Sequence, residues 1–251
     1  MRTVAVVNQK GGSAKTTTSV NVAAGLRNKG LRVLLIDMDP QAHATLHLGI
    51  SPDNSKGNMH DVLSKGSELD SIIEPVGDGL FVAPSHLALS GSEQHLLLHP
   101  LGLGNMQLRK RIGALTTRWD WIIIDCPPTL TLLTYNALIA ASELLIPIAA
   151  EYLALSGTAQ LTETLQLLKD ELDVHHRRTA AVVTRFNSHK NLCKAVLQTL
   201  REERPFEILE TVIRENVKLS EAPAQRTDIF SYDPKCNGAQ DYENLVTELT
   251  Q

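Results

Sequence analysis

Residues 8–18, NQKGGSAKTTT, decide the fold of this chain. A short apolar run at residues 3–7 leads directly into them, and a segment with the apolar spacing of a helix follows. A strand, a glycine-containing loop and a helix in this order direct backbone N–H groups, the positive end of the helix and a lysine ammonium at one anion. The stretch therefore predicts a loop for a nucleoside triphosphate, with Lys15 at the phosphates and the Thr16 hydroxyl at Mg²⁺.

The loop departs from the usual pattern G-x-x-x-x-G-K-[ST] at both glycine positions, where Gln9 and Ala14 stand. The glycine before the lysine normally leaves room for the phosphates, and the methyl group of Ala14 is tolerated there if its φ is negative. The small Ser13 side chain could offer its hydroxyl near the phosphates or face solvent, and we expect it to face solvent. The departure predicts slow hydrolysis more than weak binding, with a basal rate below about 1 s⁻¹.

Two further apolar runs end in carboxylates. Residues 33–41, VLLIDMDPQ, and residues 121–128, WIIIDCPP, are too short for helices and have the composition of buried parallel strands. They would deliver Asp37, Asp39 and Asp125 to the carboxyl edge of a sheet, where open α/β sheets bind ligands. The second run has the form of a Walker B strand. The alternative is that the three acids are only solubilising charges at strand ends.

Strand and helix signals alternate along the chain, which predicts a doubly wound, mostly parallel α/β sheet with helices on both faces, as in P-loop NTPases. A length of 251 residues, 43% hydrophobic and 4% aromatic, suits one domain over residues 1–251. Residues 51–58 are expected to form an exposed polar loop. Strands are predicted at residues 3–7, 32–36, 80–83, 121–125, 143–149, 179–186 and 208–213, and helices at 17–29, 107–117, 131–141, 158–172, 192–203 and 238–249.

Apolar runs stop short of the roughly 18 residues of a membrane span, and no signal-peptide pattern is present, so we expect a cytoplasmic protein. Three widely spaced cysteines favour reduced thiols, with Cys126 buried beside a strand end and the other two peripheral. The pairs His43/His47 and His95/His99 have helical spacing but lack further zinc ligands nearby, and we expect surface histidines.

Beyond these local patterns, the chain resembles the ParA/MinD/Soj family of deviant Walker A partition ATPases nearly end to end, and the short Soj-like group above all. The resemblance rests on Lys10-Gly11-Gly12-x-x-Lys15-Thr16, on residues 37–41 and 124–128, on Ala150-Glu151-Tyr152-x-Ala154-Leu155, and on residues 216–223, NVKLSEAP. Because residues 3–7 already have the pattern of the first strand, we expect no N-terminal DNA-reading extension like that of some plasmid members, and so no site-specific repressor.

The resemblance implies an ATP- and Mg²⁺-dependent homodimer that sandwiches its nucleotides, binds double-stranded DNA nonspecifically, and hydrolyses ATP slowly under a ParB-like or other adaptor, as a nucleoid-associated protein. Lys15 would hold the β- and γ-phosphates, and Lys10 would reach the partner's nucleotide. Asp37 and Asp125 would act on the metal mainly through its waters, and Asp39 would orient the attacking water. The implied nucleotide contacts are Lys10, Gly11, Gly12, Ser13, Ala14, Lys15, Thr16 and Thr17, with Thr184, Arg185, Ile213 and Asn216 near the base.

Net charge gives little support for DNA binding, because the chain has 24 basic residues and 28 acidic ones. Residues 175–194, however, contain no acid, and the resemblance places Lys218 on the DNA-binding face. The alternative is an ordinary solvated basic surface, and Arg185 could instead line the base pocket. The candidate DNA contacts are Arg177, Arg178, Arg185, Lys190, Lys194 and Lys218.

Two other classes of protein use the same kind of nucleotide-binding loop. A MinD-like membrane ATPase would need a basic amphipathic tail, whereas residues 238–251 carry three acids and no base, so no membrane contact is expected. A metabolic enzyme, such as an iron-protein-like reductase or an ATP-dependent synthetase, would need cluster cysteines or a substrate loop. The sequence does not identify the cargo, which could be a plasmid, a chromosome or another large body.

Overall fold

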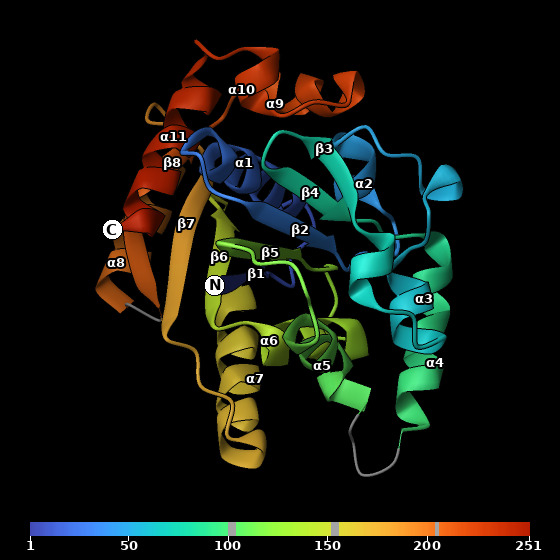
Figure 1. Ribbon diagram of the computed structural model, residues 1–251. Coiled ribbons are helices and arrows are strands. Elements are labelled where there is room, and N and C mark those ends of the chain that lie inside the picture. The colour runs from blue at the N-terminus through green and yellow to red at the C-terminus, as the bar shows by residue number, and fades with distance from the viewer. Residues whose placement is uncertain (100–103, 152–155, 204–205) are drawn as a thin grey trace.

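A computed structural model describes residues 1–99, 104–151, 156–203 and 206–251. In these residues one eight-stranded sheet has the order β3-β4-β2-β5-β1-β6-β7-β8, and all neighbours are parallel except β3 and β4 (Figure 1). The predicted doubly wound α/β fold is confirmed. The strands are β1 (Arg2–Val6), β2 (Val33–Asp37), β3 (Glu74–Gly77), β4 (Leu80–Ala83), β5 (Trp121–Asp125), β6 (Glu143–Ala149), β7 (Arg178–Phe186) and β8 (Glu207–Arg214).

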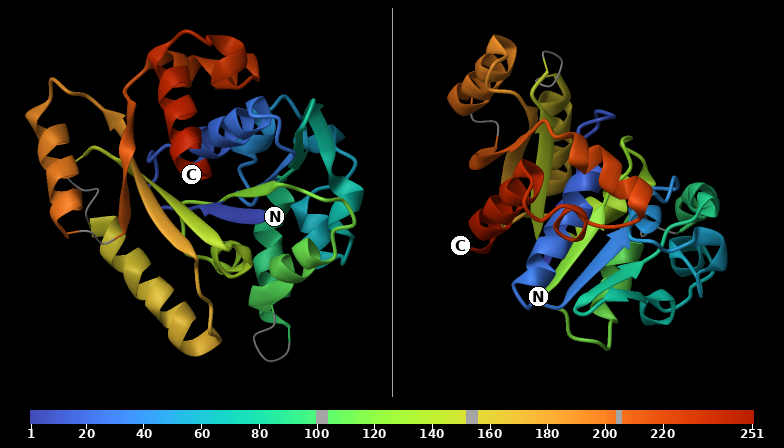
Figure 2. Two further views of the ribbon diagram at one scale, coloured as in Figure 1. Left: turned by 60° about the vertical axis from the view of Figure 1, so that its left-hand side comes forward. Right: turned by 90° about the horizontal axis from the view of Figure 1, so that it is seen from above.

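Helices cover both faces of the sheet, so the central strands are apolar along most of their length, with polar or charged residues at their ends. In β1, Val4 and Val6 face one core while Ala5 and the following Val7 face the other, as the two-residue period of a strand requires. Figure 2 shows the two helical layers on either side of the sheet. The first is built from α1 (Lys15–Asn28) and α11 (Asn237–Thr250), and the second from α5 (Gln107–Gly113), α6 (Leu132–Ala140), α7 (Ser156–Leu172) and α8 (Asn191–Glu203).

All seven predicted strands and all six predicted helices are present, with ends shifted by zero to four residues. The short elements were not predicted, because one or two helical turns give no measurable periodicity. They include the edge strand β3, and a 3₁₀ turn, Pro52–Asn54, lies within the predicted polar loop. The missed helices are α2 (His43–His47), α3 (Met59–Ser64), α4 (Ser92–Leu97), α9 (Val217–Glu221) and α10 (Ile229–Tyr232).

One expectation about exposure was wrong. His47 is only 3% exposed, because its helix α2 packs against the segment that contains Thr227. Among the cysteines, Cys126 is buried as expected, Cys193 of α8 is also buried, and Cys236 is half-buried. All three cysteines are free thiols.

The C-terminal helix packs on the domain as predicted, through Leu245, Val246 and Leu249, which are at most 4% exposed. No helix within the described residues combines the length and the apolar character that crossing a membrane would require.

Strand β1 lies at the centre of the sheet, between β5 and β6, and its carboxyl end opens into the loop that begins α1. Val6 is paired with Asp125 of β5, and Asp125 is paired in turn with Asp37 of β2. The sheet therefore brings the loop and two of the three predicted acids to one edge, at the point where the strand order reverses.

Candidate nucleotide and metal site

Side-chain hydrogen bonds anchor the loop after β1 to the neighbouring strands β6 and β7. The Asn8 amide donates to the carbonyl of Pro147 (2.6 Å) and accepts from the Lys10 N–H (2.9 Å), which ties the loop to the end of β6. The Thr184 hydroxyl at the end of β7 donates to the Ser13 carbonyl (3.1 Å). Gly12 has φ +76°, a conformation that only glycine adopts without strain. The conformation of the loop is therefore held by neighbours on both sides.

Ala14 has φ +66° and ψ +30°, in the left-handed region. The condition under which its methyl group would be tolerated, a negative φ, is therefore not met. Ala14 precedes α1, and its side chain cannot cap the helix. The loop holds Ala14 in a left-handed conformation that glycine would adopt without strain. An L-residue in this region costs about 1 kcal/mol or more.

Two buried polar atoms of the loop lack partners among the described residues. They are the Ser13 hydroxyl, whose residue is 1% exposed, and the Gln9 amide nitrogen. The expectation that Ser13 faces solvent was wrong, because the loop folds over it. A buried donor without a partner is costly, so an anion in this loop would complete the hydrogen bonding.

Lys15 is 7% exposed, and its ammonium donates to the carbonyl of Lys10 across the loop (3.2 Å). Burial lowers the pKa of Lys15, and the negative charges of Asp125 and Asp39 partly offset that effect. Among the described residues this ammonium hydrogen-bonds a carbonyl and forms no direct ion pair, so it is incompletely neutralised, which suits a group that receives a phosphate.

The carboxylates beside the loop are the most buried acids of the site. Asp125 accepts from the hydroxyls of Thr16 (2.8 Å) and Ser19 (2.7 Å), and both it and Asp37 are fully buried. Burial raises the pKa of both carboxyl groups, and the charge of Asp125 raises that of Asp37 further. Two adjacent buried carboxylates favour a cation, and a hydroxyl with carboxylates is an oxygen donor set that Mg²⁺ accepts.

Within the described part of the chain, no three His, Cys, Asp or Glu side chains are placed to bind one ion together, and the histidine pairs form no zinc site. A Mg²⁺ ion held here would therefore depend on Thr16, on phosphate oxygens and on waters, with the carboxylates acting through those waters. Asp39 is 8% exposed and lies two residues beyond Asp37, where its carboxylate accepts from the Gln41 N–H (2.9 Å).

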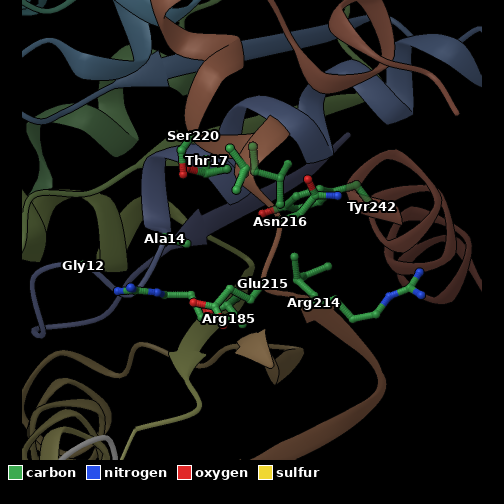
Figure 3. Close-up of a pocket in the computed structure, with 13 residues that line it drawn as sticks. Gly12, Ala14, Thr17, Arg185, Arg214, Glu215, Asn216, Ser220 and Tyr242 are labelled. Atoms are coloured by element: carbon green, nitrogen blue, oxygen red, sulfur yellow. The ribbon is translucent and has the colours of Figure 1, made fainter. Parts of the chain in front are cut away.

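A cavity of about 460 Å³ opens beside the loop, within the usual range for small-molecule sites. Figure 3 shows that its walls come from the loop, from the end of β7 and from the segment between β8 and α9. Tyr242 of α11 closes it from behind and hydrogen-bonds Thr18 (3.1 Å). The lining includes the predicted Gly12, Ala14, Thr17, Thr184, Arg185, Ile213 and Asn216, and also six residues that were not predicted as nucleotide contacts, Arg214, Glu215, Val217, Leu219, Ser220 and Tyr242.

Lys10 does not line the cavity and is held within its own chain. Its ammonium donates to Glu151 (2.8 Å), which also lies 3.3 Å from the Arg185 guanidinium. Hydrogen bonding from Lys10 lowers the pKa of the Glu151 carboxyl. Arg185 reaches over the loop toward Gly12 in Figure 3, so one acid joins both cations beside the cavity. Tyr152, Ala154 and Leu155 of the same motif lie outside the described residues.

The basic stretch does not form one patch. Arg177 and Arg178 lie at the amino end of β7, where Arg178 makes a bidentate pair with Glu207 (2.7 and 2.9 Å). Lys190, Lys194 and Lys218 follow the carboxyl ends of β7 and β8. None of them lines the cavity, but Lys190 pairs with the lining residue Glu215 (3.0 Å) and Lys218 lies between the lining residues Val217 and Leu219. The nine-residue strand β7 separates the two groups by about 25 Å. The candidate DNA contacts therefore do not all lie at one edge of the sheet.

Sequence reasoning also missed two polar residues of the site. Ser19 lies four residues after Lys15, one helical turn away, so its approach to Asp125 could have been inferred from helix spacing. Glu151 follows the buried strand β6 as Asp125 ends β5, and the same strand-end argument applied to it. Most of the cavity wall from Arg214 to Ser220 lies in the motif at residues 216–223, but of that motif only Asn216 was predicted as a nucleotide contact.

Comparisons with known proteins agree with this geometry. The model of the AAA domain family matches residues 1–177. The chain is 38% identical over 247 residues to the sporulation initiation inhibitor protein Soj of Bacillus subtilis (strain 168), covering 98% of this chain and 97% of that protein. It is also 38% identical over 249 residues to the chromosome partitioning protein ParA of Myxococcus xanthus, covering 99% and 87%.

Among solved structures, cobyrinic acid a,c-diamide synthase from Mycobacterium smegmatis with bound ADP and magnesium superposes with a TM-score of 0.85. The identity is 30%, and the match covers 100% of this chain and 94% of that one. The same protein has been solved with an ATP analogue and magnesium.

Proposed function

This chain belongs to the ParA/Soj family of partition ATPases, and we propose that it is an ATP-dependent switch that partitions a chromosome or plasmid. In this proposal the ATP form dimerises around two nucleotides and holds DNA without sequence preference. Hydrolysis, accelerated by a partner protein, returns the protein to a monomer that releases DNA. The observation that carries the proposal is the pair of loop lysines, one directed into the loop and one directed out of it.

The proposed roles follow from these positions. Lys15 would turn from the Lys10 carbonyl to the β- and γ-phosphates, and the N–H groups of residues 11–17 would surround them. Mg²⁺, when bound, neutralises charge on the phosphate oxygens. Thr16 would be its direct ligand, while Asp125 and Asp37 would hold its waters. Asp39, at the mouth of the site, would orient the water that attacks the γ-phosphate.

The base would occupy the 460 Å³ cavity, near Thr184, Ile213 and Asn216. Asn216 supports this assignment, because its side-chain oxygen accepts from the Lys218 N–H (2.8 Å) and so leaves its amide nitrogen available. Arg214 is directed away from the cavity toward α11, where Asp241 pairs with it, and is not proposed as a base contact.

DNA would contact the edge formed by Lys190, Lys194 and Lys218. In a dimer closed over the nucleotides, this edge from each protomer would lie near the shared interface. Doubling the number of phosphate contacts would then raise both the affinity and its salt dependence. Arg177 and Arg178 are left out of this proposed contact, because they lie at the other end of β7.

The whole chain, residues 1–251, is proposed to act as one domain, in the cytoplasm and on the nucleoid. The acidic face of α11 gives no support for a membrane contact. The partner that stimulates hydrolysis is proposed to be a ParB-like or other adaptor protein.

The test is DNA binding measured with ATP, with ADP and without nucleotide, together with the molecular mass by light scattering. We expect a dimer and DNA retention with ATP only. Lys10→Ala should remain a monomer with ATP and lose DNA binding, while Lys65→Ala, which removes an exposed lysine at the end of α3, should behave as the wild type. Equal DNA binding in all three nucleotide states, or a Lys10→Ala dimer, would contradict the proposal.

A further inference from the structure

The carboxylate of Asp37 is held by a residue that sequence patterns do not single out. Thr45, in the first turn of α2, donates twice to the same Asp37 oxygen, from its backbone N–H (2.9 Å) and from its hydroxyl (2.7 Å). Both residues are 0% exposed. Thr45 is eight residues beyond Asp37, so the contact depends on how the chain folds back after β2.

The orientation of the Thr45 hydroxyl is determined by a third residue. The Ser85 N–H, just after β4, donates to the Thr45 oxygen (2.9 Å). Because the oxygen accepts from that side, its own hydrogen is directed to Asp37. The hydroxyl therefore links the end of β4 to the end of β2, two strands that are neighbours in the sheet.

The second oxygen of Asp37 is also engaged. It accepts from the N–H of Asp39 (3.1 Å), and Asp39 in turn accepts from the Gln41 N–H. Asp37 is thus hydrogen-bonded at both oxygens and cannot rotate without breaking at least one bond. Thr45 holds one oxygen of Asp37. The backbone N–H of Asp39, the acid proposed to orient water, holds the other.

The local fold explains why Asp37 and Thr45 meet. Ala42 precedes α2 in a left-handed conformation, with φ +54°, and has no side chain that could cap the helix. The free N–H groups of the first turn need an acceptor, and the Asp37 carboxylate supplies one. Capping alone would require only the backbone bond, so the hydroxyl bond adds a restraint that the helix does not need.

We propose that Thr45 is a positioning residue for the Mg²⁺-dependent step, and that its hydroxyl holds the Asp37 carboxylate in the orientation that receives metal-bound water. The inference rests on the metal role proposed for Asp37, and it does not depend on DNA binding or dimerisation. Outer partners of metal-site groups typically change metal affinity or activity 10- to 100-fold when removed.

The test compares Thr45→Val, which has nearly the same shape but no hydroxyl, with Thr45→Ser, which keeps it. The Mg²⁺ concentration that half-saturates binding of a fluorescent ATP analogue is measured first, then kcat and KM. For Thr45→Val we expect half-saturation to rise about tenfold and kcat to fall about tenfold, with analogue binding in EDTA unchanged. Thr45→Ser should stay within about twofold of the wild type in every quantity.

Thr134→Val serves as the matched control, because it removes another buried threonine hydroxyl, on α6, which donates to the Thr129 carbonyl and not to a carboxylate. It should leave the Mg²⁺ dependence unchanged. If Thr45→Val does not fold, as judged by thermal unfolding, Thr45→Ala takes its place in the same comparison. The proposal is overturned if the variant without the hydroxyl keeps wild-type Mg²⁺ half-saturation, or if Thr45→Ser is impaired equally. A failure of DNA binding with the expected Mg²⁺ shift would count against the partition role alone.

Discussion

At the scale of single residues, Ala14 is where the chain departs most from what its loop requires. The loop imposes a left-handed backbone, which costs alanine about 1 kcal/mol relative to glycine. Ala14→Gly relieves this strain, while the extra freedom of glycine in the unfolded chain costs at most about 1 kcal/mol. We therefore expect Ala14→Gly to change the free energy of unfolding by less than about 0.5 kcal/mol, measured by urea denaturation.

Ala24→Gly is the matched control for Ala14→Gly. Ala24 lies in the same helix, fully buried, with ordinary helical backbone. The same substitution there should destabilise the protein by about 1 kcal/mol or more. Equal losses at the two positions would show that the strain assigned to Ala14 is absent.

A second residue-scale prediction concerns Glu151, which holds Lys10 and Arg185 within one subunit. If Lys10 must leave this pair to reach a second subunit, Glu151→Gln should favour the ATP dimer. Since the pair is partly exposed, we expect a two- to fivefold lower dimer dissociation constant in analytical ultracentrifugation. Glu207→Gln removes an acid paired with Arg178 at the other edge and should have no effect. Weaker dimerisation of Glu151→Gln would mean that the acid supports the dimer.

Much of the site could be predicted residue by residue. Lys15, Thr16, Asp37 and Asp125 are determined by position, because each ends or follows a strand whose apolar run is visible in the sequence. Ser13 and Thr45 could not be placed in the same way. Whether a small polar side chain is buried, and what it contacts, depends on chain segments from other parts of the sheet.

At the scale of elements, too, some parts could be predicted from local sequence and others could not. The strands β1, β2 and β5 were predictable because burial on both faces demands continuous apolar residues. The helices α2 and α10 were not, because each has five residues or fewer and exists only through contacts made elsewhere in the chain. His47 illustrates this, since its Nε2–H donates to the carbonyl of Thr227 (3.1 Å) and joins α2 to the start of α10.

His47 makes this junction sensitive to acid. Burial lowers its pKa from 6.5 to about 4, so the folded protein resists the proton that the unfolded chain takes up. A lowered pKa leaves stability unaffected above pH 6.5 and reduces it as the pH falls from 6.5 to 4. The full loss corresponds to about 3 kcal/mol. Chemical denaturation across this range should show it for the wild type.

His47→Gln provides the comparison, because its amide can donate to Thr227 but does not titrate in this range. The stability difference between the wild type and this variant should change by about 3 kcal/mol between pH 7 and pH 4. His43→Gln, an exposed position on the same helix, should follow the wild type at every pH. A wild-type profile parallel to that of His47→Gln would be the contrary result.

At the scale of the whole molecule, the sheet separates basic residues that are close in sequence. A run without acids indicated one surface, but a strand that crosses the molecule carries its two ends to opposite edges. Ion pairs within the chain also affect which lysines are available to DNA. Lys190 and Lys218 pair with Glu215 and Glu221, whose carboxylates a phosphate would have to replace. A run of basic residues in the sequence therefore does not by itself predict a basic surface.

This separation gives the sharpest test of how the molecule holds DNA. Lys218 lies on α9 at the nucleotide edge, and Arg178 lies at the other end of β7. For the ATP form, Lys218→Ala should weaken binding to DNA of any sequence. It should also reduce the slope of log affinity against log salt by roughly 0.9 for each DNA phosphate that the variant no longer neutralises, or nearly 2 in a dimer. Arg178→Ala should leave both unchanged in fluorescence anisotropy titrations, because Arg178 pairs with Glu207 at the edge that the proposed DNA contact leaves out. The reverse pattern would move the DNA-binding surface to the amino edge of the sheet, and a sandwich closed over the nucleotides could then no longer account for ATP-dependent DNA binding.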